Sequence, residues 1–233
     1  MSSVLYCKIF NQKDFNKFSD NHKKNMKTNF TIITPSLNSG DKIQKCIDSV
    51  NSQLGVSIKH VIVDGGSTDN TINVLKENKI VYYELSGSSI YEALNYGYKY
   101  SNSDLIGFLN CDDFYTNSNA LKKIYDSYKD NTSYDIFYGN CRFVNSKNKL
   151  LYKLKSPKNH SFLLQKKRIF SISHPCWFVK HDVFLENNLY NTKYRYVSDC
   201  DFIIKALKNK FKFFYVDTYV ANFVIHDSNA SNS

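Results

Sequence analysis

Residues 61–71 read VIVDGGSTDNT, and they combine the end of a strand, a tight turn and the start of a helix. The β-branched run Ile58–Val63 favours a strand, and Asp64 follows directly at its end. The two glycines after Asp64 permit a tight turn. Thr68 or Asp69 can then cap a helix, with Asp69 serving best as a plain N-cap. This strand–turn–helix unit predicts an α/β fold.

The same unit recurs on both sides of this stretch. Expected strands are Phe30–Thr34, Ile58–Val63, Ile80–Tyr83 and Leu105–Leu109. Three helices are expected in this half. The first covers about residues 41–54, and the second carries Ile72, Val74 and Leu75. The third begins with a capping box formed by Ser89 and Glu92. Such alternation predicts a mostly parallel sheet covered by helices. In open sheets of this kind, ligands bind beyond the carboxyl ends of the strands.

The second half of the chain has a mixed pattern. A helix is expected around Leu121–Tyr128, and another at Asp199–Leu207. Further expected strands are Tyr134–Tyr138, Arg142–Asn145, Leu150–Leu154, Cys176–Val179 and Phe211–Val216. We expect one domain over residues 30–233, with a nucleotide-binding half at 30–115 and an acceptor half at 116–233. Residues 1–29 form an N-terminal extension, unless the true start is Met26.

Composition sets the broad class of the protein. The 233 residues are 42% hydrophobic, which is typical of a globular chain. No apolar run reaches the length of a membrane helix, and the first residues do not resemble a signal peptide. The six cysteines are scattered without metal-binding spacing, which favours reduced thiols over disulfides. These features predict a cytoplasmic protein.

The formal net charge of +10 is unevenly distributed, because residues 141–180 contain ten Lys or Arg and no Asp or Glu. Such a stretch attracts phosphates, nucleic acid or an anionic membrane surface. A solvated lysine-rich face explains the same pattern equally well.

Two adjacent carboxylates, Asp112 and Asp113, end the apolar run of the fourth expected strand. Adjacent carboxylates repel one another, and burying them unpaired is costly. A divalent cation with oxygen ligands would resolve the repulsion. An acidic helix-capping turn is the alternative. Asp64 ends a neighbouring strand at the same sheet edge, where it can accept hydrogen bonds from a nucleotide base or ribose.

Four motifs together carry a family resemblance: ITPSLN, VIVDGGSTDNT, SIYEALNYG and GFLNCDD, over residues 30–115. In this order and spacing they resemble the inverting family 2 glycosyltransferases of the GT-A fold. The similarity is greatest to the bacterial branch that acts in O-antigen, capsule and colanic-acid synthesis. It continues more weakly to about residue 225 through SHPCWFVK and VSDCDFIIKAL. The resemblance implies a Rossmann-like, mostly parallel central sheet flanked by helices.

The resemblance also implies roles for single residues. Asp113 would bind a divalent metal, Mn²⁺ or Mg²⁺, with support from Asp112, and Asp199 would be the general base. Asp201 would support Asp199, although Asp199 also fits a plain helix N-cap. His174 would lie on the acceptor side, and His226 could reach the diphosphate or the metal. The nucleotide would contact Thr34, Pro35, Ser36, Asp64, Gly65, Asn95, Asn110 and Asp112. The Ser86–Ser89 segment departs from the family, which commonly carries an acidic residue there.

These roles fit the chemistry of sugar transfer. A cation stabilises the diphosphate leaving group, and a separate carboxylate deprotonates the acceptor hydroxyl. We therefore expect a metal-dependent inverting transferase that moves a sugar, most simply from a UDP-sugar, to a glycan or lipid-linked saccharide in surface polysaccharide synthesis. Contact with the anionic inner membrane through residues 141–180 would suit such an acceptor.

Two other readings of the sequence compete with this one. A nucleotidyltransferase also uses paired acids, but ITPSLNSG lacks a basic residue to hold a triphosphate. A nucleic-acid-binding module would explain the charge, but the acidic pair has the wrong sign for a phosphate backbone. We therefore expect no nucleic-acid partner.

Overall fold

The computed structural model describes residues 27–159 and 172–226. The expected N-terminal extension up to Met26 lies outside the described residues, and so do residues 160–171 of the basic stretch. No helix in the described parts is long and apolar enough to cross a membrane. The five cysteines that lie in these parts are free thiols, as the sequence predicted.

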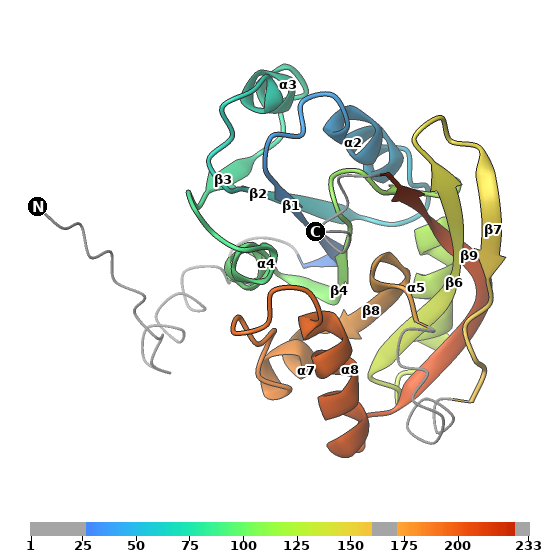
Figure 1. Cartoon of the computed structure of the whole chain (residues 1–233). Coiled ribbons are helices and arrows are strands. Elements are labelled where there is room, and N and C mark those ends of the chain that lie inside the picture. Colours follow the sequence, from blue (N-terminus) through green and yellow to red (C-terminus); the bar gives the residue numbers. More distant parts are fainter. Residues whose placement is uncertain (1–26, 160–171, 227–233) are drawn as a thin grey trace, which may run out of the picture.

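The described residues form strands and helices in alternation (Figure 1). The strands are β1 (Thr28–Ser36), β2 (Ile58–Asp64), β3 (Tyr82–Glu84), β4 (Ser103–Phe108), β5 (Phe114–Tyr115), β6 (Ile136–Asn145), β7 (Leu150–Leu154), β8 (Trp177–Lys180) and β9 (Phe213–Ile225). The helices are α2 (Ile43–Asn51), α3 (Thr71–Glu77), α4 (Ile90–Tyr98), α5 (Ala120–Asp130), the 3₁₀ turn η2 (His174–Cys176), α7 (His181–Glu186) and α8 (Ser198–Lys208).

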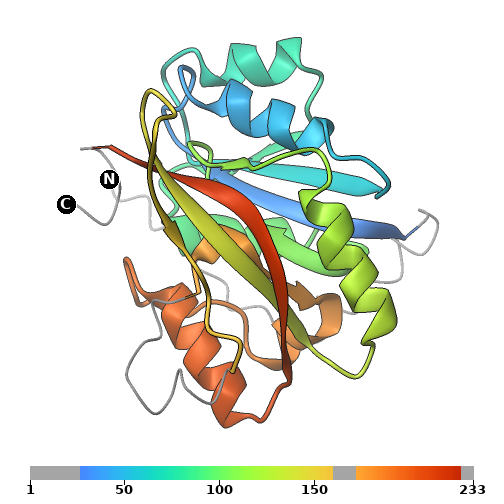
Figure 2. The same ribbon diagram turned by 90° about the vertical axis from the view of Figure 1, so that its right-hand side faces the viewer.

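One mixed sheet joins these strands in the order β3-β2-β1-β4-β8-β6-β9-β5, with β7 paired to β6. Strands β1, β2, β3 and β4 are parallel, as the sequence predicted. From β8 onward most pairings are antiparallel, but β9 runs parallel to β6. Figure 2 shows β9 lying along β6, with β7 at the other side of β6.

Helices cover both faces of the parallel half. Consecutive strand residues point to opposite faces, so Ile32 joins the core under α2 while Ile33 joins the core under α4. Gly97 lets α4 lie directly on β1, because a Cβ at this position would come within 2.5 Å of Ile33 Cγ2. The capping box predicted at the start of α4 is present, since Ser89 and Glu92 bond reciprocally.

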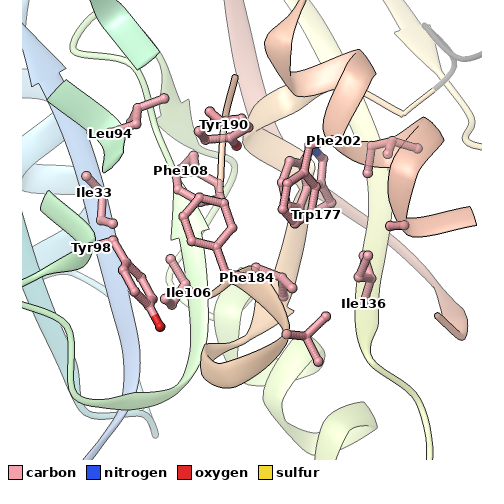
Figure 3. Close-up of a cluster of buried hydrophobic side chains, with 14 of the residues drawn as sticks. Ile33, Leu94, Tyr98, Ile106, Phe108, Ile136, Trp177, Phe184, Tyr190 and Phe202 are labelled. Carbon is pink, nitrogen blue, oxygen red and sulfur yellow. The ribbon is translucent and has the colours of Figure 1, made fainter. Parts of the chain in front are cut away.

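An aromatic cluster fills the space between the parallel half and helices α7 and α8 (Figure 3). The Trp177 ring stacks on Phe202, with centroids 5.3 Å apart. Phe108, at the end of β4, contacts Phe184 and Tyr190 in the same cluster. This packing fixes the end of β4 against the second half of the chain.

The structure corrects the sequence prediction in the second half. The two strands expected at Tyr134–Tyr138 and Arg142–Asn145 are one continuous strand, because Gly139 lets β9 approach closely and Asn140 is satisfied inside the sheet. Strand β9 is also longer than the expected Phe211–Val216 and continues to Ile225. Its extra length returns the chain to the carboxyl end of the parallel strands.

Candidate active site at the carboxyl edge of the sheet

The first part of the site is built by the ends of β1 and β2. These strands are in parallel register, so that Ser36 pairs with Asp64. The Gly65 amide donates to the Ser36 carbonyl at 2.7 Å, which ties the two strand ends together. The shared edge expected from the sequence is therefore present.

Asp64 is buried and its carboxylate holds the following turn. It accepts hydrogen bonds from the amides of Gly66 and Ser67, at 3.0 and 2.7 Å, and from Ser67 Oγ at 2.6 Å. Gly66 has a φ of 97°, a conformation that favours glycine. The carboxylate thus fixes the loop beside the expected nucleotide site.

The residues after the middle of β1 are also buried. Thr34 Oγ1 lies 2.9 Å from His60 Nε2, and Pro35 continues the pairing with β2. Ser36 Oγ is buried without a hydrogen-bond partner among the described residues. An unpartnered buried hydroxyl at a strand end is a place where a ligand could supply the missing bond.

The second part of the site joins the end of β4 to the end of β9. His226 Nε2 lies 2.7 Å from Asp112 Oδ2, although the two residues are 114 positions apart. The side chains of His226 and Asp112 are 14% and 18% exposed. The long β9 strand therefore brings an imidazole to the acidic pair.

Asp113 points the other way, into the protein. It is 1% exposed, and its two carboxylate oxygens accept from the Val224 amide at 2.9 Å and from Asn110 Nδ2 at 3.2 Å. Burial and the nearby Asp112 carboxylate raise the pKa of Asp113 well above its ordinary value. Asp113 holds β9 against the acidic loop, and this geometry favours Asp112 rather than Asp113 as the outward-facing carboxylate.

The donor set suits a divalent cation that also binds phosphate oxygens. Within residues 27–159 and 172–226 no group of three or more His, Cys, Asp or Glu side chains gathers in a metal-binding arrangement. Mg²⁺-type sites at nucleotides, however, commonly use only one or two protein carboxylates, with substrate phosphates and water completing the shell. Asp112 with His226 fits such a site.

A third part of the site lies at the start of α8. Asp199 stands in the first turn of this helix, and its Oδ1 is 2.9 Å from Tyr91 Oη. The same hydroxyl lies 2.9 Å from the Tyr196 carbonyl. Burial, with the nearby Asp199 carboxylate, raises the pKa of Tyr91, so this phenol stays a hydrogen-bond donor. Asp201, by contrast, forms an ion pair with Lys205 at 2.7 Å.

His174 links the second and third parts. Its ring stacks on Phe108 with centroids 5.5 Å apart, and its Nε2 lies 2.9 Å from Tyr190 Oη. Burial lowers the pKa of His174, although the nearby Asp199 opposes the shift. The lowered pKa favours the neutral imidazole, and the ring is close enough to Asp199 to interact with its charge.

Asn95 has a structural partner in this region. Its Nδ2 donates to the Tyr190 carbonyl at 2.8 Å, and its Oδ1 accepts from the Tyr190 amide at 3.0 Å. Both ends of the amide are thus engaged by backbone, which does not favour the nucleotide contact expected from the resemblance.

Tyr91 and Tyr190 were missed by the sequence reasoning. Tyr91 was visible within the motif SIYEALNYG, but only the fold shows that its hydroxyl meets Asp199. No local signal marks Tyr190.

A separate cavity of about 480 Å³ lies at the opposite end of β2, under the end of α2. His60, Lys59 and Tyr83 are among its lining residues, and none of the predicted site residues is. The cavity is therefore distinct from the carboxyl-edge site.

Comparison with known proteins finds glycosyltransferases among the relatives of this chain. A PGL/p-HBAD biosynthesis glycosyltransferase from Mycobacterium bovis is 27% identical over 186 residues, covering 77% of this chain and 70% of the relative. The poly(ribitol-phosphate) beta-N-acetylglucosaminyltransferase TarP from Staphylococcus aureus is 32% identical over 117 residues, which cover 47% of this chain and 35% of TarP.

Solved structures share the fold. S. aureus TarS residues 1–349, in complex with UDP-GlcNAc, superimposes with a TM-score of 0.72 at 18% identity, covering 88% of this chain and 61% of TarS 1–349. The mannosyltransferase PcManGT from Pyrobaculum calidifontis, in complex with GDP-Man and Mn²⁺, gives a TM-score of 0.65 at 12% identity, covering 94% of this chain and 65% of that chain. The present chain thus spans less than two thirds of either structure.

The family model described as glycosyl transferase family 2 matches residues 31–187, which is more than half of the chain. The match includes the ends of β1 and β2, Tyr91 and the acidic pair after β4. The chain belongs to glycosyl transferase family 2 and is a glycosyltransferase.

Proposed function

We propose that this enzyme transfers a sugar from a UDP-sugar to a saccharide acceptor in glycan synthesis, with inversion at the anomeric carbon and with a divalent cation. The observation that carries the proposal is the separation of two acidic centres. Asp112 is paired with His226, whereas Asp199 stands on another helix and accepts a hydrogen bond from the Tyr91 phenol. A single displacement needs such a division between leaving-group stabilisation and base.

Two observations support a UDP-sugar as the donor: the names and ligands of the relatives, and the polar groups at the carboxyl edge of the sheet. TarS was solved with UDP-GlcNAc, and TarP is named as an N-acetylglucosaminyltransferase. Among the described residues Ser36 Oγ has no hydrogen-bond partner beside the turn that Asp64 holds, which supports a polar ligand at that edge. We assign the base and ribose of the nucleotide to this part of the site.

The diphosphate belongs beside Asp112 and His226. These two residues would hold the cation, which neutralises negative charge on the departing diphosphate when it is bound. Asp113 and Asn110 would keep the loop in place without reaching the cation. This order reverses the roles that the sequence resemblance gave to the two aspartates.

Asp199 is the general base in this proposal. Its carboxylate takes the proton of the acceptor hydroxyl as that oxygen attacks the anomeric carbon. The bond from the anomeric carbon to the diphosphate oxygen breaks, and the nucleoside diphosphate leaves from the opposite face. Tyr91 would orient the carboxylate, and His174 would lie on the acceptor side.

The proposal is tested by incubating the purified protein with UDP-, GDP- and dTDP-sugars, with and without Mn²⁺, and an acceptor panel of saccharides. We expect release of one nucleoside diphosphate, dependent on Mn²⁺, and a product whose anomeric configuration is opposite to that of the donor by NMR. A retained configuration would contradict the single displacement. Transfer that proceeds equally well after chelation would contradict the cation.

A further inference from the structure

The β6–β7 hairpin exposes three consecutive apolar side chains. Leu150, Leu151 and Tyr152 are 45%, 48% and 51% exposed. Strand β7 pairs with β6 alone among the described strands, so it forms an open edge of the sheet. Figure 1 shows this strand at the outer margin of the molecule. Because side chains alternate along a strand, Leu150 and Tyr152 lie on one face of β7 and Leu151 on the other, so the hairpin exposes apolar side chains on both of its faces. Apolar side chains exposed along an open edge mark an interaction surface.

Lysines surround these apolar residues. Exposed side chains of this kind are Lys147, Lys149, Lys153, Lys155 and Lys158. The adjacent strand β9 contributes one exposed acid, Asp217, which faces Lys155 and Lys158 and also accepts from Tyr215 and Asn140. The hairpin therefore keeps an excess of positive charge.

The hairpin is already ordered. Asn145 Oδ1 accepts from the amides of Lys147 and Lys149, at 3.1 and 2.9 Å, and Asn148 takes the left-handed conformation that closes the turn. The Tyr152 ring stacks on Phe143, with centroids 4.5 Å apart. A preformed surface loses little conformational entropy when it binds.

We propose that the β6–β7 hairpin docks the enzyme edge-on on an anionic lipid surface, so that Leu150 and Tyr152 from one face of β7 and Leu151 from the other enter the interface while the lysines contact headgroups. Apolar side chains next to a cluster of lysines are what such a surface binds. A second copy of the chain fits less well, because pairing two β7 edges would bring like-charged lysines together.

The position of the hairpin connects docking with the site. Asn145, at the end of β6, is in register with Ile225, which directly precedes His226. Docking would therefore bring the site close to the lipid surface, where a lipid-linked acceptor lies. This last step rests on the proposed function, whereas the docking itself does not.

The test is flotation of the full-length protein with vesicles of neutral phosphatidylcholine, or of phosphatidylcholine with about 30 mol% phosphatidylglycerol, at low salt. One variant carries Lys147→Gln, Lys149→Gln and Lys155→Gln, and another carries Leu150→Ser and Leu151→Ser. The matched control removes the same charge elsewhere: Lys76→Gln, Lys193→Gln and Lys208→Gln. Thermal unfolding checks that every variant is folded.

We expect the wild type to float with anionic but not neutral vesicles, and to be released at about 0.5 M salt. Both hairpin variants should bind at least about tenfold more weakly, while the control changes by less than about twofold. Equal binding to neutral vesicles, or an equal loss in the control, would overturn the proposal. A lipid-independent dimer that Leu150→Ser and Leu151→Ser dissolve would assign the hairpin to a second copy instead. Transfer to a soluble acceptor should be unchanged in both hairpin variants, so docking and catalysis fail separately.

Discussion

Tyr91 Oη lies 2.9 Å from Asp199 Oδ1, across 108 residues of sequence. Tyr91 belongs to α4, which packs on β1 and β2, whereas Asp199 lies in the first turn of α8 in the second half of the chain. This hydrogen bond therefore connects the two halves of the chain. One is the half that we assign to nucleotide binding, and the other carries Asp199, which we assign as the general base. A carboxylate held by a neutral donor keeps its orientation without losing its capacity to accept a proton.

Replacing Tyr91 with Phe tests this coupling. The substitution removes the hydroxyl and keeps the buried ring, so the fold should persist while the Asp199 carboxylate loses its orientation. We expect kcat to fall by roughly 5- to 50-fold, with KM for the nucleotide sugar changed less than about twofold. Steady-state kinetics measure both. A larger effect on donor KM than on kcat would show that Tyr91 acts on the nucleotide side.

Replacing Asp199 with Asn separates binding from chemistry. The amide is close in size to the carboxylate but cannot take the acceptor proton, so transfer should fall by at least about a thousandfold while calorimetric affinity for UDP is retained. Asp201→Asn is the matched control, two positions along the same helix. It removes only the partly exposed ion pair with Lys205, which is worth less than about 1 kcal/mol. Comparable loss of transfer in both variants would contradict the assignment of Asp199.

Gly97 tests the packing that carries the site. An alanine Cβ there would lie 2.5 Å from Ile33 Cγ2 and 3.3 Å from Val63 Cγ2, so α4 must move away from the sheet. We expect Gly97→Ala to lower the free energy of unfolding by about 1–3 kcal/mol, measured by urea denaturation. The exposed helical residue Glu77 gives a control, and Glu77→Ala should change stability by less than about 0.5 kcal/mol. Equal stability of the two variants would show that α4 does not pack this closely.

His60 makes stability depend on pH. Burial lowers the pKa of His60 to about 4, from an ordinary value of 6.5, and its Nδ1 is buried without a hydrogen-bond partner among the described residues. Between these values the unfolded chain binds a proton that the folded chain does not. Stability from this residue is therefore complete above pH 6.5 and is lost as the pH falls toward 4.

His60→Gln keeps a polar partner for Thr34 and removes the titration. Urea denaturation at several pH values should show that the wild type loses about 1–3 kcal/mol more than the variant on going from neutral pH to the acid end of this range. Parallel pH profiles would show that His60 titrates normally in the folded protein.

The parallel half of the fold could be predicted because its signals are local. The β-branched run of β2, the glycine turn after Asp64 and the capping box at Ser89 each act within a few residues. The antiparallel half could not be predicted to the same degree. The expected strand Tyr134–Tyr138 stops before Gly139, yet Gly139 lies within β6 and lets β9 approach closely, and the length of β9 follows from pairing with β6.

For the candidate site too, local sequence patterns predicted some features, whereas others depend on contacts between distant residues. The acids after β2 and β4 could be placed on one sheet edge from the strand pattern alone. Which of the two adjacent aspartates faces outward could not be predicted, because the choice depends on the amide of Val224, more than a hundred positions away. The pairing of Asp112 with His226 depends on the same long strand.

In the mechanism that we propose, Asp112 and His226 together hold the cation on a nucleoside diphosphate. Calorimetric titration of UDP with and without Mn²⁺ tests it on the wild type, Asp112→Asn, His226→Gln and Asp113→Asn, with thermal unfolding to check each fold. We predict that Mn²⁺ tightens UDP binding in the wild type, and that Asp112→Asn and His226→Gln each lose at least about tenfold of that gain. Asp113→Asn should mainly lower stability. UDP affinity that is the same with and without Mn²⁺, or a gain that survives Asp112→Asn intact, would contradict the account.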